Sequence, residues 1–133
     1  MNMQNNLVNT IQHCEAVCEH MTTLVHCLPN LHLRVAQMRL LRDCADICSL
    51  TAKYIARGSN FARHAAHLCA MIFEACANEC LRFPDHHSQH CAQVCLHCAQ
   101  QCRAFAMMPM GEMMMPMGEM MPPMGEMMMP MNL

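Results

Sequence analysis

The chain has 133 residues, room for one domain and a tail, and its 8 basic and 10 acidic side chains leave a net charge of −2. This nearly balanced charge gives no indication of binding to nucleic acid or to an anionic membrane surface. No apolar run is long enough to span a bilayer and the first residues do not form a signal peptide, so we expect a cytoplasmic protein with no membrane association.

Two helices are predicted in the first half of the chain. The first covers about residues 5–27 and stops before Pro29, because proline disfavours helical backbone in the residue that precedes it. The second covers about residues 31–57, with Gly58 as its C-terminal stop.

Two further helices follow. Ser59 is a candidate N-cap for a helix that continues to about residue 83, and Asp85 is a candidate N-cap for a helix that ends near residue 106. Four helices of similar length with short connections predict an all-α fold, an antiparallel up-down-up-down four-helix bundle over residues 1–106.

Residues 107–133 differ sharply in composition. They hold 14 of the 19 methionines and a seven-residue repeat, Met-Pro-Met-Gly-Glu-Met-Met. Proline and glycine in each repeat break a helix, so we interpret this segment as a disordered, Met-rich, low-complexity tail. Thioethers bind Cu(I) without losing a proton, which favours a role in metal capture; the alternative is a tail that only consumes oxidant as sulfoxide.

The 12 cysteines dominate the functional interpretation. In the fourth helix, the sequence Cys-Ala-Gln-Val-Cys-Leu-His-Cys-Ala-Gln-Gln-Cys spaces four thiols by 4, 3 and 4 residues, which places them on one helical face. Cysteines four residues apart on one helix are poorly placed to bridge each other. In a chain without an export signal, many cysteines indicate metal binding more than disulfides.

The other helices repeat this arrangement, so the thiols are expected to line one central channel. The predicted metal ligands on these inward faces are Cys14, Cys18, Cys44, Cys48, Cys69, Cys76, Cys80, Cys91, Cys95, Cys98 and Cys102. Met21 continues the stripe of the first helix and is an auxiliary candidate. Cys27 is a further candidate, although it lies roughly 140° away from Cys14 around the helix.

Counting about 1.5 Å per residue from the end of the bundle near Pro29 and Pro84 predicts that the thiols form layers. One such layer consists of Cys14, Cys44, Cys69 and Cys98.

Thiolate ligands in such a channel favour Cu(I). Neighbouring side chains at i, i+4 have Cβ atoms about 5–6 Å apart, and a metal–thiolate bond is about 2.3 Å long, so successive thiolates can share metal ions. Soft ligands select Cu(I), and we predict a store of multiple Cu(I) ions per chain.

Two alternatives remain open. One is a metallothionein-like Zn/Cd buffer, although structural zinc sites use four ligands, usually from paired CxxC motifs, and Cys95–Cys98 is the single CxxC. The other is a thiol-rich structural or interaction protein, in which cysteine acts as a small buried hydrophobe. Catalysis is not predicted, because neither the Glu-x-x-His pairs of di-iron bundles nor a βαβ context for a redox CxxC is found.

Three segments resemble the bacterial copper storage proteins, a family of cysteine-rich four-helix bundles, and in particular its cytosolic branch. They are Arg-Asp-Cys-Ala-Asp-Ile-Cys at residues 42–48, Glu-Ala-Cys-Ala-Asn-Glu-Cys at 74–80, and the cysteine row of 91–102. The resemblance implies Cu(I) held by core cysteines, a homotetramer of bundles and a role in copper storage or detoxification. Met21 and Met38 stand where the family commonly has cysteines and Phe73 interrupts the row of the third helix, so we expect fewer Cu(I) ions than in its cysteine-richest members.

Overall fold

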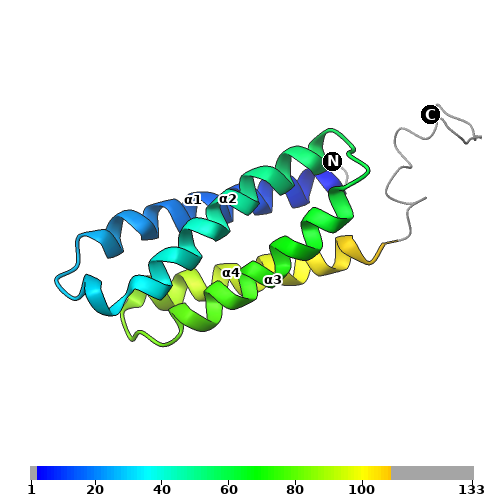
Figure 1. Ribbon diagram of the computed structural model, residues 1–133. Coiled ribbons are helices and arrows are strands. Elements are labelled where there is room, and N and C mark those ends of the chain that lie inside the picture. The colour runs from blue at the N-terminus through cyan, green and yellow to red at the C-terminus, as the bar shows by residue number, and fades with distance from the viewer. Residues whose placement is uncertain (1–2, 109–133) are drawn as a thin grey trace, which may run out of the picture.

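The protein is described by a computed structural model for residues 3–108, and these residues form a bundle of four antiparallel helices (Figure 1). The helices are α1 (Met3–His26), α2 (Val35–Ala56), α3 (Ala62–Cys80) and α4 (His86–Ala106), with a short 3₁₀ turn, η1 (Leu31–Leu33), before α2. No strand occurs among residues 3–108. The predicted all-α fold is therefore confirmed.

The helices form a ring in chain order, in which α1 packs on α2, α2 on α3, α3 on α4 and α4 on α1. Figure 1 shows the α1–α2 and α3–α4 connections at one end, which we call the two-loop end, and the start of α1 with the end of α4 at the opposite end. Apart from Met107 and Met108, the predicted Met-rich tail lies outside the described residues.

Two of the predicted helix boundaries have the expected local causes. Gly58 follows α2 with a positive φ of 65°, a backbone conformation that glycine adopts without a steric cost. Asp85 caps α4, because its Oδ2 accepts a hydrogen bond of 2.9 Å from the backbone N–H of Ser88.

The start of α3 differs from the prediction. The hydroxyl of Ser59 accepts a hydrogen bond from the backbone N–H of Phe61 at 3.0 Å, so it stabilises the turn ahead of the helix. Phe61 occupies the N-cap position without a side-chain cap, and the helix begins at Ala62. The prediction of Ser59 as N-cap is wrong for this reason.

The core has an apolar zone at the end opposite the two-loop end and a thiol zone along the rest of the bundle. The apolar zone is made of large aliphatic and aromatic side chains that are at most 5% exposed: Leu7, Ile11, Ile55 and Phe105. At the surface, the Arg103 guanidinium joins α4 to α3 through two hydrogen bonds, of 2.8 and 2.6 Å, to the carboxylate of Glu74. The apolar zone and this ion pair hold the helices together without using a thiol.

Candidate metal centre

Eleven cysteine side chains lie inside the bundle. Each is at most 1% exposed, and all are free thiols: Cys14, Cys18, Cys44, Cys48, Cys69, Cys76, Cys80, Cys91, Cys95, Cys98 and Cys102. Met21, also predicted, is 3% exposed and belongs to the same core. Cys27 is different: it follows the last residue of α1 and is exposed, so the structure does not bring it to the core.

The centre of this thiol zone is a tetrad formed by Cys14, Cys18, Cys44 and Cys95, from three different helices. Their four sulfur atoms lie within 4.8 Å of one another. The Sγ atoms of Cys18 and Cys44 are 3.4 Å apart, and those of Cys14 and Cys95 are 3.9 Å apart. A metal ion bound to two sulfurs at about 2.3 Å separates them by at most about 4.6 Å, so the tetrad has nearly the spacing that shared metal–thiolate bonds require.

The layer predicted by counting residues is wrong for Cys69. Cys69 lies against the thiols of Cys102 and Cys48 instead of joining Cys14 and Cys44. The reason is the connection between α3 and α4: residues 81–85 are not helical and Asp85 is extended, so this link spans more length than 1.5 Å per residue. The α3 row therefore sits lower against α4 than counting predicts.

The thiols of the tetrad shift one another's pKa values in opposite directions. Hydrogen bonding from Cys14, and then from Cys44, lowers the pKa of Cys18. The pKa values of Cys44 and Cys95 are raised, chiefly through hydrogen bonds with Cys14 and Cys18. Beside the tetrad, the pKa of Cys76 is lowered to about 5, because hydrogen bonding with Cys18 raises it but that with Cys44 and other thiols outweighs this effect.

These opposite shifts have a chemical consequence. One thiolate in the group is stabilised by the S–H groups around it, whereas each further ionisation meets negative charge in a buried site. The group gives up its first proton readily and retains the others until a cation binds. Thiolate ligands that lose protons to metal are expected to load many cations while remaining buried.

Polar side chains close the thiol zone at the two-loop end. The Arg34 guanidinium donates hydrogen bonds to Asp85 Oδ1 at 2.9 Å and Ser88 Oγ at 3.2 Å, and to Gln37 Oε1 at 3.1 Å. The Gln37 amide donates to Ser88 Oγ at 2.9 Å and to the sulfur of Cys80 at 3.4 Å. Arg34 is 5% exposed, while Gln37 and Ser88 are fully buried. We call these four residues, Arg34, Gln37, Asp85 and Ser88, the polar cap.

The charge of the polar cap is balanced within it. Burial raises the pKa of Asp85, but hydrogen bonds from Arg34 and Ser88 outweigh this effect and the pKa is lowered overall. The Asp85 carboxyl is therefore ionised at neutral pH, where it pairs with the Arg34 guanidinium at 2.9 Å.

Sequence reasoning missed two polar residues that contact thiols, Gln37 and Thr51. Both are fully buried, and Thr51 hydrogen-bonds Cys69, which lowers the pKa of that thiol against a net rise. Gln37 lies 7 residues before Cys44, and Thr51 lies 3 residues after Cys48. This helical spacing puts both on the buried face of the cysteines and could have identified them from the sequence. Conversely, all ten histidines are exposed, so none of them supplies a ligand to the buried core.

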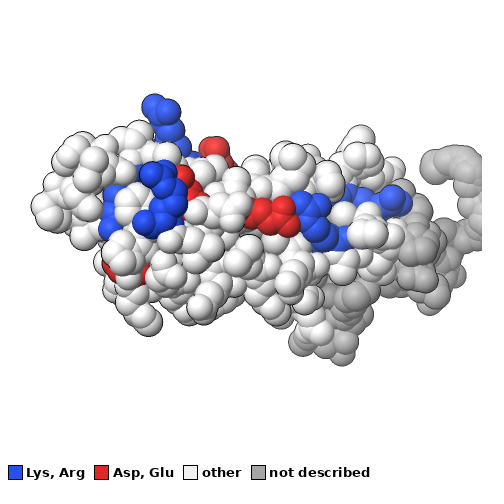
Figure 2. Space-filling view, turned by 90° about the horizontal axis from the view of Figure 1, so that it is seen from below, with Lys and Arg blue, Asp and Glu red and all other residues white. Residues whose placement is uncertain are grey.

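The charges on the outer surface of the described residues are mixed in sign. Figure 2 shows one face on which acidic and basic side chains lie in small groups separated by uncharged surface. None of the helices in residues 3–108 combines the length and the apolar character that crossing a membrane requires.

The fold and the site together define a class of protein: a helical bundle that holds soft metal ions on thiols of its core. Comparison with known proteins gives the family. Residues 1–107 match the family described as Csp, copper storage protein, and the chain belongs to this family.

Individual relatives agree with this assignment. The chain is 41% identical over 83 residues to the cysteine-rich protein YhjQ of Bacillus subtilis strain 168, a match that covers 61% of this chain and 75% of YhjQ. Among solved structures, the Cu(I)-bound copper storage protein BsCsp3 is 36% identical with a TM-score of 0.74, over 79% of this chain and 99% of that one. A cytosolic copper storage protein from Streptomyces lividans, loaded with five coppers, is 25% identical with a TM-score of 0.77, over 80% and 94% of the two chains.

Proposed function

We propose that this protein stores Cu(I) in the cytosol on the thiolates of its eleven buried cysteines, with Met21 as an auxiliary ligand. The observation that carries the proposal is the tetrad, whose four sulfurs lie within 4.8 Å of one another among further buried thiols. Cysteine as a mere apolar filler explains one or two such residues. It does not explain a continuous thiol zone drawn from four helices.

Copper is favoured over zinc or cadmium by the way the thiols are arranged. A structural zinc site encloses each ion in four ligands, usually carried by CxxC knuckles in loops. Here the thiols form rows along helices, in which neighbouring sulfurs can bridge ions of low coordination number. The cytosolic location is supported by the Streptomyces lividans relative, which is described as cytosolic.

The role is storage and not catalysis. Every core thiol is at most 1% exposed, so none is open to a substrate larger than an ion. The family to which the chain belongs is likewise described as a storage family.

Self-association into a homo-oligomer, a tetramer by resemblance to the family, forms part of the proposal. It is supported by exposed apolar side chains on α3, where Leu68 is 46% and Met71 is 49% exposed, three residues apart on one face. The substitution Leu68→Glu should shift the mass measured by light scattering from the oligomer towards the monomer, whereas Leu96→Glu on α4 serves as a control.

The experiment that tests storage is an anaerobic titration of the fully reduced protein with Cu(I) against a competing chelator. We expect tight binding of many ions, near or above one per core cysteine. Replacing the four tetrad cysteines by alanine removes four of eleven core thiols and should lower the capacity by about a third or more. The single substitution Cys18→Ala should lower it measurably if the fourfold variant does not fold.

Cys27→Ser is the matched control, because Cys27 is exposed and lies outside the thiol zone. It should leave the number of tightly bound ions unchanged. Binding of two or three ions that zinc displaces would replace the proposal by a Zn/Cd buffer, and binding of almost none would identify the thiols as packing residues.

A further inference from the structure

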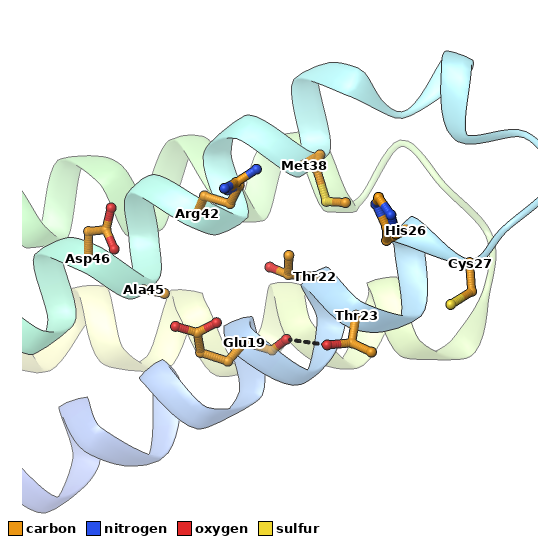
Figure 3. A pocket seen from close by; sticks show the side chains of 9 residues that line it. All are labelled: Glu19, Thr22, Thr23, His26, Cys27, Met38, Arg42, Ala45 and Asp46. Atoms are coloured by element: carbon orange, nitrogen blue, oxygen red, sulfur yellow. Dashed lines mark hydrogen bonds between the residues drawn. The ribbon is translucent and has the colours of Figure 1, made fainter.

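The structure raises the question of how an ion reaches the thiols. The polar cap closes the thiol zone at the two-loop end, and the apolar zone closes it at the other end. The side of the bundle offers a third approach. A groove of about 460 Å³ lies between α1 and α2 near the two-loop end, and Figure 3 shows its lining.

Three soft metal-binding side chains line this groove: His26, Cys27 and Met38. Figure 3 shows His26 of α1 and Met38 of α2 pointing toward each other from the two facing helices. Cys27 lies at the rim, where it is exposed and its side chain is turned outward. The histidine and the thioether therefore face one opening from two helices, and the thiol lies at its rim.

Met38 connects this groove with the interior. It is half-buried and packs against the core that contains the thiols, while it also lines the groove. An ion held by its thioether sulfur is thus placed at the boundary between solvent and core.

The charge in the groove suits a cation. Glu19 and Asp46 line it together with Arg42, which makes two carboxylates against one guanidinium. The net charge of these three groups is −1, which attracts a monovalent cation by a screened interaction.

The ligand types set a direction of transfer. Neutral imidazole and thioether ligands bind Cu(I) without losing a proton, whereas thiolates add charge and bind it more tightly. An ion bound to His26 and Met38 therefore has a higher free energy than one bound to the core thiols. Its transfer from the groove to the core is favourable.

We propose that the groove between α1 and α2 is an acquisition site for Cu(I), in which His26 and Met38 bind the ion and Cys27 provides a thiol at the rim. The proposal rests on the storage function of the core. The copper stays in the +1 state throughout. Its donor ligands are exchanged for the imidazole and the thioether, these are exchanged for core thiols, and each thiol that binds releases its proton to solvent.

The test compares loading rates. The double variant H26Q/M38L removes two donors with little change in volume, and its loading from a Cu(I)–chelator complex is followed by stopped-flow absorption of the Cu(I)–thiolate bonds. We expect the initial rate to fall by about tenfold or more, while the final number of bound ions and the melting temperature stay those of the wild type. The control variant H20Q makes the same histidine substitution at an exposed position of α1 outside the groove, and it should load at the wild-type rate.

The outcomes separate this inference from the storage function. A wild-type loading rate in H26Q/M38L overturns the acquisition site and leaves storage intact. An equal loss of rate in H20Q also overturns it, because the effect would then not belong to the groove. A wild-type protein that takes up almost no Cu(I) overturns both proposals.

Discussion

The two ends of the bundle close the same thiol zone by opposite means. At the two-loop end, the buried polar cap joins α2 to α4 and its Gln37 amide contacts the sulfur of Cys80 at 3.4 Å. At the other end, Ile11 and Phe105 lie among apolar side chains, and each such burial stabilises the fold by about 1.5–3 kcal/mol. This comparison indicates that the apolar zone stabilises the fold independently of the thiol zone, which binds the metal. Burial in the apolar zone stabilises the bundle with or without metal, whereas we expect the thiols to add stability once metal is bound.

Of the effects that distinguish the thiol zone from the apolar zone, we expect the largest to be the pH dependence of the free energy of unfolding of the metal-free protein. The pKa values of seven buried thiols are raised above 9.0 in the folded protein and those of two are lowered: raised are Cys14, Cys44, Cys48, Cys69, Cys80, Cys95 and Cys98, and lowered are Cys18 and Cys76. Above pH 9 the unfolded chain loses these protons while the folded chain keeps most of them. The unfolded state then binds fewer protons, so stability falls as pH rises, by up to about 1.4 kcal/mol per pH unit for each thiol that stays protonated.

Denaturant unfolding of the reduced, metal-free protein between pH 8 and 11 measures this effect. The Cu(I)-loaded protein is the control, because its thiols have already exchanged protons for metal and its stability should change much less over the same range. Equal pH dependence of the two forms would contradict a protonated thiol core.

The next effect concerns the apolar zone. Ile11→Ala removes a fully buried side chain and should lower the free energy of unfolding by about 3 kcal/mol, through lost burial and the cavity that remains. The number of bound Cu(I) ions should stay the same, because no thiol is removed. Cys18→Ala is the matched substitution in the thiol zone and should show the reverse pattern, with a small change in metal-free stability and a lower capacity. A lower capacity in Ile11→Ala would show that the two zones are not separable.

The sequence predicted the thiol zone well because its signal is local. The spacing of cysteines on each helix determines which face is buried, and Cys91 through Cys102 needed no knowledge of the other helices. Cys27 was separable for the same reason, since its angle on the helical wheel already placed it off the stripe. The register between helices is different, because it depends on how much length the connections span. Counting through residues 81–85 as if they were helical placed Cys69 in the wrong layer.

The polar cap was beyond sequence reasoning for a related reason. Gln37 lies on the cysteine stripe, but its partners Arg34, Asp85 and Ser88 come from a connection and another helix, and their meeting depends on tertiary packing. Spacing within one helix can identify a buried polar residue and cannot identify what satisfies it.

A smaller effect is expected from the polar cap itself. Asp85→Ala removes the N-cap of α4 and leaves the buried Arg34 without its carboxylate, so we expect a loss of about 2 kcal/mol in stability. Thermal unfolding of the metal-free protein measures it, and Arg82→Ala is the control, because the ion pair of Arg82 with Glu79 lies at the surface and should contribute little. If Asp85→Ala is as stable as the wild type, the polar cap does not stabilise the two-loop end. Of the two ends, only the one with the apolar zone would then be shown to stabilise the fold.

The smallest effect on the bundle is expected from removing residues 109–133. This truncation leaves all eleven core thiols and the described fold in place, so the capacity and the melting temperature should not change. The rate of Cu(I) uptake should fall severalfold at low metal concentration, because the truncation removes 12 of the chain's thioether donors. A variant of full length with leucine in place of those methionines keeps the length and charge and should load as slowly as the truncated chain. α4 ends at the end of the bundle opposite the groove. These variants leave the groove residues unchanged, so a slower rate in them would indicate a second contribution to Cu(I) capture, separate from that of the groove. An unchanged loading curve would mean that the methionines have no part in metal uptake and that the thiol core loads without them.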